Sequence, residues 1–176
     1  MAKRVISFGL SEEEINRAIK ELKDYKSNLV KKCEEFRHRV AELIREKSQE
    51  KFNSAIVDDL TPESGGARMA EVNVIVEDSD DVTLVIAQGE DAVWVEFGAG
   101  VYHNGSTGSS PNPYGANLGF TIGGFGENGK KKTWGFYENG DLKITHGTPA
   151  TMPMFHAVES VLADIEDIAK EVFSGD

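Results

Sequence analysis

The stretch that decides the fold is SEEEINRAIKELKDYKSNLVKKCEEFRHRVAELIREKSQEKF, residues 11–52. Ser11 stands three residues before Glu14, and this pairing is typical of the capping box that begins a helix. Apolar residues then recur at helical spacing on one stripe: Ile15, Ala18, Leu22, Tyr25, Leu29, Phe36, Val40 and Leu43. The spacing predicts one long amphipathic helical region that begins at Ser11.

The length of this region raises a question about what it packs against. No glycine or proline occurs between Ser11 and Asp59, so an unbroken helix of about forty residues would extend about 60 Å. Such a helix either bends near residues 26–28 into a hairpin or packs against neighbouring subunits, and the sequence leaves both open. Cys33 falls on the apolar stripe and is interpreted as a small core residue rather than a nucleophile.

Alternating patterns follow the helical region. A break at residues 61–66 precedes two β-type runs, residues 72–76 and 82–87, which predict a hairpin across an Asp-rich turn. Residues 93–97 continue the apolar pattern as a strand or a short turn of helix. Further on, Asn139-Gly140 separates two more short runs, and this dipeptide is a strong hairpin signal.

Between these hairpins lies a loop, residues 98–129, with ten glycines in thirty-two residues. We expect this loop to order wholly or partly on assembly with a partner, because glycine loses much conformational entropy when it becomes ordered. The final stretch, residues 153–173, has apolar residues at helical spacing. Pro153 suits its first turn, and Thr151 is the expected cap.

These elements predict an α+β fold. A small, mostly antiparallel sheet is packed by the long N-terminal helix (or helical hairpin) and the C-terminal helix, with the long Gly-rich loop between strands. We divide the chain into an N-terminal helical region, residues 1–60, and an α+β body, residues 61–176, within one structural domain overall.

Charge limits the classes of partner. The net charge is −11; residues 1–55 carry 13 basic against 10 acidic residues, a net of +3, so the rest carries −14. This balance argues against nucleic acid as a direct partner. A mildly basic N-terminal region, residues 1–55, on an acidic body favours head-to-tail contacts between copies, although two solvated surfaces are an equally good interpretation.

Compartment and chemistry are constrained as well. One cysteine and no apolar run of membrane-spanning length indicate a protein of the reducing cytoplasm with no membrane partner. The glycine pattern at residues 124–129 lacks the Ser or Thr that a phosphate loop needs after its lysine, so no cofactor is predicted. The four histidines show no paired metal-ligand spacing, and no metal is predicted.

Two segments resemble a known family: VWVEFGAG, residues 93–100, and THGTPATMPMF, residues 145–155. They are similar to the minor tail-component or tail-completion proteins of long-tailed bacteriophages and prophages, whose V-E-F-G-T-G stretch precedes a variable glycine-rich loop and a His-Gly-Thr segment. Ala99 replaces the usual Thr, and Met154 intervenes between Pro153 and Phe155.

The resemblance implies a structural protein of the head-tail junction (neck) or tail completion, localised in the virion after assembly in the host cytoplasm. The resemblance also implies that the chain forms a homo-oligomeric ring or docks on neighbouring neck or tail proteins, and that it has no catalytic residues. The residues expected to carry interaction or structural roles are Glu96, Phe97, Gly98, Gly100, His146, Gly147, Pro153 and Phe155. We also expect the two segments to pack together, with His146 capping backbone groups or contacting Glu96.

Two other hypotheses compete with this interpretation. One is a small hydrolase that uses Glu96 and a histidine, either His103 or His146. The other is a phage-encoded binding module whose loop recognises a host protein.

Overall fold

The computed structural model describes residues 7–57, 68–98, 112–115, 117–118, 134–145 and 148–174. The helices and strands in chain order are α1 (Glu12–Asn53), β1 (Ile56–Val57), β2 (Arg68–Met69), β3 (Asn73–Asp78), β4 (Thr83–Gln88), α2 (Asp91–Phe97), β5 (Trp134–Glu138), β6 (Asp141–Thr145) and α4 (Pro153–Phe173). The predicted α+β class, with a long helix at the N-terminal end and a helix at the C-terminal end, is confirmed. The Gly-rich loop lies outside the described residues apart from 112–115 and 117–118.

Helix α1 is a single rod of 42 residues rather than a hairpin. Its start is the predicted one, because the Ser11 side chain accepts a hydrogen bond from the backbone N–H of Glu14. The Ser11 hydroxyl also donates to the Glu14 carboxylate at 2.9 Å. At 1.5 Å per residue the rod extends about 63 Å.

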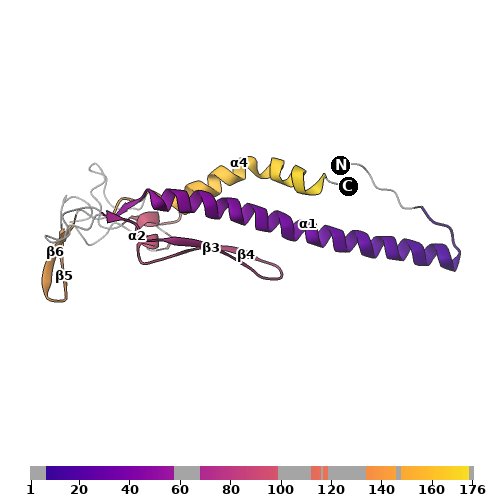
Figure 1. The fold of residues 1–176 in the computed structure, drawn as a ribbon, viewed down its shortest axis with the longest axis horizontal. Coiled ribbons are helices and arrows are strands. Elements are labelled where there is room, and N and C mark those ends of the chain that lie inside the picture. The colour runs from indigo at the N-terminus through magenta and orange to yellow at the C-terminus, as the bar shows by residue number, and fades with distance from the viewer. Residues whose placement is uncertain are drawn as a thin grey trace.

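The C-terminal half of α1 forms the middle layer of the body. Figure 1 shows α4 along one side of this half and the β3–β4 hairpin along the other. Helix α4 runs antiparallel to α1, since Phe173 contacts Phe36 at a ring distance of 6.0 Å while α4 begins near the other end. On the hairpin side, the Gln49 side chain accepts a hydrogen bond from Val74 N at 2.8 Å and donates to Val72 O at 2.9 Å.

The hydrophobic core lies where the C-terminal end of α1, the base of the hairpin and α2 meet. Its buried members are Phe52, Ala55, Val57, Val74 and Val95. Phe52 and Val95 have no exposed surface. Met154, in the first turn of α4, packs against this core, so the core also positions the start of α4.

The strands form three separate two-stranded antiparallel ladders in the described part of the chain, rather than the one small sheet that was expected. The two predicted hairpins are present as β3–β4 and β5–β6. Asn139 and Gly140 make the second turn with φ angles of 52° and 92°, as the Asn-Gly step predicted. Alternation identifies paired strands but does not determine whether neighbouring pairs join, and here they remain apart.

The N-terminal half of α1 extends beyond both flanking layers (Figure 1). We call residues 12–35 the arm. Cys33 lies on its apolar stripe but is exposed, so the interpretation of Cys33 as a core residue is wrong. The spacing was correct, but α4 and the hairpin end before they reach this part of the rod. The expected boundary near residue 60 falls outside the described residues.

The position of the core generates a prediction about stability. Phe52→Ala removes a fully buried ring and should lower the free energy of unfolding by about 3–5 kcal/mol. Leu10→Ala is the control, because Leu10 is 91% exposed and its truncation should change stability by no more than about 0.5 kcal/mol. Urea denaturation followed by circular dichroism measures both, and equal losses would show that the core lies elsewhere.

Candidate functional site

The candidate site is the junction between α2 and the first turn of α4, which brings together the two segments singled out in the sequence. The Glu96 carboxylate accepts hydrogen bonds from Met154 N at 2.8 Å and Phe155 N at 3.1 Å. A helix leaves its first amide groups without partners inside the helix, and a carboxylate there is stabilising. Glu96 therefore caps α4 from another helix.

The cap replaces the local one that was expected from Thr151. The N-cap residue is Met152, in the left-handed region with φ 52° and ψ 53°, and it makes no side-chain cap hydrogen bond. Instead, the backbone N–H groups of Thr151 and Met152 donate to Val95 O at 2.9 and 3.3 Å. The prediction of a Thr151 cap is thus wrong, because α2 supplies the acceptors that a local side chain would otherwise provide. Pro153 does occupy the first turn, as predicted.

Gly98 allows the two segments to approach closely. Its φ of 81° ends α2, and its N–H donates to Trp94 O at 2.7 Å. A Cβ atom at this position would lie 3.2 Å from Ala150 Cβ and 3.3 Å from Ala150 N. Because L side chains rarely adopt this φ, a side chain at position 98 would meet both backbone strain and crowding.

A third hydrogen bond to Glu96 comes from a residue that the sequence reasoning missed. Asn112 is 3% exposed and its Nδ2 donates to Glu96 Oε1 at 2.8 Å. Its Oδ1 accepts from Tyr114 N at 2.9 Å, which is the local side-chain turn that Asn favours before Pro. The Asn112-Pro113-Tyr114 sequence predicts that turn, although nothing in this short motif predicts a contact with Glu96.

Helix α2 is held at its other end by a second carboxylate. Asp91 receives two hydrogen bonds from the Arg68 guanidinium, at 2.6 and 2.8 Å, and one from Glu71 N at 2.9 Å. Bidentate pairs of this kind are strong and directional. Asp91 and Glu96 together fix α2 between the β2 side of the body and α4.

The two carboxylates have opposite electrostatic environments. Burial raises the pKa of Glu96 above the ordinary 4.5, although the amides of Met154 and Phe155 and the Asn112 side chain act in the opposite direction. Hydrogen bonding from Arg68 lowers the pKa of Asp91 below the ordinary 3.8, against the effect of its own burial. The difference arises because Asp91 has a cationic partner in direct contact and the contacts to Glu96 come from neutral donors.

An apolar groove of about 630 Å³ opens beside the Glu96 cap, between α2, α4 and a segment that contributes Asn112, Tyr114 and Leu118. Phe52 and Phe97 belong to its wall, and Phe155 lies there with its ring 6.2 Å from that of Tyr114. The outer part of the wall consists of half-exposed or exposed apolar side chains: Val93, Tyr114, Leu118, Val158 and Leu162. The groove suits apolar side chains rather than a charged ligand.

The predicted packing of the two segments is confirmed for the residues that the structure describes: Glu96, Phe97, Gly98, Pro153 and Phe155 all lie at the junction or in the groove wall. Gly100, His146 and Gly147 lie outside the described residues, as does the expected contact of His146 with Glu96. His156 is the described histidine that acts on Glu96 electrostatically, and its own partner is Glu159 at 3.2 Å.

In the described ranges, no group of three or more His, Cys, Asp or Glu side chains could hold a metal ion. None of the helices in those ranges is long and apolar enough to cross a membrane. Comparison of the chain with protein-family models, curated proteins and solved structures finds no match. The arrangement at Glu96 is therefore interpreted from its own geometry, in which the carboxylate orders three neutral donors.

The opposite pKa shifts predict opposite effects of pH on two variants. The folded protein holds the Glu96 proton more tightly than the unfolded chain, so raising the pH from about 4.5 upward favours unfolding. The difference in free energy of unfolding between wild type and Glu96→Gln should therefore become less favourable to wild type as the pH rises through this window. Asp91 stabilises the fold above pH 3.8, and the advantage of wild type over Asp91→Asn should shrink as the pH falls below it.

Denaturant unfolding of the three proteins across pH 3–7 measures these differences. Each variant is the control for the other, because both remove one buried carboxylate from α2. The opposite pKa shifts would be contradicted if the stability difference between wild type and each variant did not change with pH. They would also be contradicted if both differences changed in the same direction.

Proposed function

We propose that this chain is a structural protein of the head-tail junction or of tail completion in a long-tailed bacteriophage, and that it acts by assembly and docking rather than by catalysis. The observation that carries the proposal is the arm. About half of a 42-residue helix projects from the body, and the large apolar side chains of its stripe are exposed, although Ala18 on the same stripe is buried. An amphipathic helix in this state lacks the surface it needs to bury that stripe, and a neighbouring protein supplies one.

The geometry at Glu96 supports a structural role for the two segments on which the phage resemblance rests. One segment provides a carboxylate and a carbonyl, and the other provides four backbone N–H groups that donate to them. Glu96 thus acts as a helix cap: the residue is 7% exposed, and its carboxylate accepts hydrogen bonds from Met154 N, Phe155 N and Asn112 Nδ2.

The assembled protein would occupy the virion at the neck or tail end, with itself and neighbouring neck or tail proteins as partners. The net charge of −11 keeps the free protein apart from other acidic molecules, DNA included. A ring is the form that repeated head-to-tail contacts produce when the rotation closes. The exposed arm and the apolar groove are two different surfaces, as such a contact requires.

A gene deletion in the phage or prophage that encodes this chain tests the proposal. Electron microscopy of the lysate should show heads and tails unjoined, or tails with an aberrant end, and infectious titre should fall by several orders of magnitude. A plasmid copy of the wild-type gene should restore joined particles. Normal infectious virions from the deletion would refute the assignment.

The same complementation assay separates the hydrolase alternative from an assembly role. Plasmids that carry His103→Ala or His146→Ala should restore joined particles if the protein acts by assembly. Loss of titre with both variants, from proteins that are still incorporated into particles, would favour catalysis by Glu96 and a histidine.

A further inference from the structure

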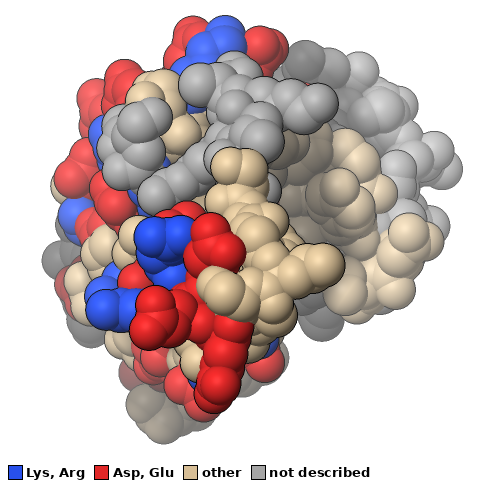
Figure 2. Space-filling view, turned by 90° about the vertical axis from the view of Figure 1, so that its right-hand side faces the viewer, with Lys and Arg blue, Asp and Glu red and all other residues tan. Residues whose placement is uncertain are grey.

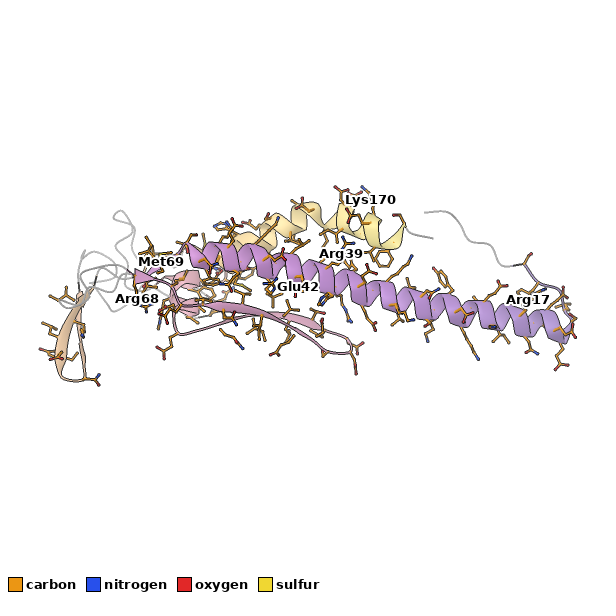
Figure 3. All side chains as sticks on the ribbon, in the orientation of Figure 1. Arg17, Arg39, Glu42, Arg68, Met69 and Lys170 are labelled. Atoms are coloured by element: carbon orange, nitrogen blue, oxygen red, sulfur yellow. The ribbon has the colours of Figure 1, made fainter. Side chains whose placement is uncertain are left out.

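The arm carries six large apolar side chains that are at least one-third exposed: Ile15, Ile19, Leu22, Tyr25, Leu29 and Val30. The first five recur every three or four residues and so lie on one face of the helix, which Val30, directly after Leu29, widens. Figure 3 shows the side chains of this half of α1, with Arg17 labelled, around a rod that extends beyond α4 and the β3–β4 hairpin. In the end-on view of Figure 2, charged residues nearest the viewer gather on one side and uncharged residues on the other.

The groove beside Glu96 is a second apolar surface with exposed side chains. Tyr114, Leu118 and Leu162 are 62%, 61% and 57% exposed at its mouth. A groove lined by aliphatic and aromatic side chains is the kind of site into which amphipathic helices lay their apolar face. Its volume of about 630 Å³ accommodates several such side chains.

The arm of a molecule cannot fill the groove of the same molecule. Phe52, near the C-terminal end of α1, belongs to the groove wall, whereas the arm ends at Glu35 in the same unbroken helix. Seventeen residues of straight helix separate the two, about 25 Å along the axis, and the arm points away from the groove (Figure 1). The arm of another copy has no such restriction.

Charge favours this pairing over an association of two arms. The middle of the arm, residues 20–32, carries five lysines against Glu21 and Asp24, a net of +3, whereas the acidic residues at both ends give the whole arm a net charge of −1. Helix α4, which forms one side of the groove, carries five acidic residues against Lys170, a net of −4. Glu159 belongs to the groove wall, and Glu166 follows it two turns later on the same face of α4. Two arms that paired at their lysine-rich middles would repel each other, whereas the lysine-rich middle of an arm is attracted to the acidic side of α4.

We infer that the arm of one copy docks in the groove between α2 and α4 of a second copy. The stripe centred on Leu22 enters the groove, and Lys23 and Lys26 face the acidic side of α4. Each molecule then donates one arm and offers one groove, so the contact is heterologous and repeats from copy to copy. This inference rests on the proposed assembly function and names the surfaces through which copies join.

Cysteine cross-linking tests the contact in the full chain. In a Cys33→Ser background, Leu22→Cys on one preparation and Leu162→Cys on a second, larger-tagged preparation are mixed and oxidised. Heterodimers should exceed both homodimers several-fold at low salt. Val82→Cys, 50% exposed at the tip of the β3–β4 hairpin, replaces Leu162→Cys as the matched control and should give only background. Far-ultraviolet circular dichroism of each variant verifies that it is folded.

Charge reversal tests the orientation in the same assay. Lys23→Glu with Lys26→Glu on the arm partner should lower heterodimer yield at least about threefold, and Glu159→Lys with Glu166→Lys on the groove partner should restore part of it. Excess Leu22→Cys homodimers would replace the inference with an arm-to-arm contact, and yields at the Val82 background would overturn it. Either failure leaves the gene-deletion result unaffected, and normal virions from the deletion would refute the phage role while leaving a positive cross-link intact.

Discussion

The Glu96 carboxylate ties the end of α2 to the beginning of α4, and the arrangement of the body depends on this contact. Pro153 has no N–H group to satisfy, and the next two amides of α4 donate to Glu96. The carbonyl of Val95 receives the two amides before the helix, and Gly98 leaves the room that this approach needs. Once its first turn is fixed in this way, α4 runs back along α1 as far as Phe36.

This arrangement divides α1 into two parts with different requirements. The C-terminal half is enclosed by α4 and the β3–β4 hairpin, and polar contacts such as the hydrogen bonds of Gln49 hold the hairpin against α1. The arm keeps the same amphipathic pattern without an enclosing layer. A groove with exposed apolar walls remains at the opposite end of the body. The molecule therefore has exposed apolar side chains on the arm and in the groove, and residues 20–32 are basic where α4 is acidic. For this reason we propose that copies of the chain assemble.

Local patterns predicted the elements of this fold well. The Ser11–Glu14 capping box, the helical spacing after it and the Asn139-Gly140 turn each depend on residues a few positions apart. The features that sequence did not predict involve distant residues. Glu96 and Met154 are 58 positions apart, so the cap could not be derived from local spelling, and Thr151 was chosen in its place. The exposure of Cys33 depends on where α4 ends, which periodicity in α1 cannot specify.

Amide hydrogen exchange in wild type and Glu96→Ala is the most direct measurement of the central claim, that Glu96 holds the first turn of α4. In wild type, the N–H groups of Met154 and Phe155 should be protected as strongly as those of later turns. In the variant, their protection should fall by about tenfold or more, with a loss of about 1–3 kcal/mol in the local opening free energy. Glu159→Ala, which removes an exposed carboxylate from the same helix, should leave both amides protected. Unchanged protection in Glu96→Ala would contradict the account.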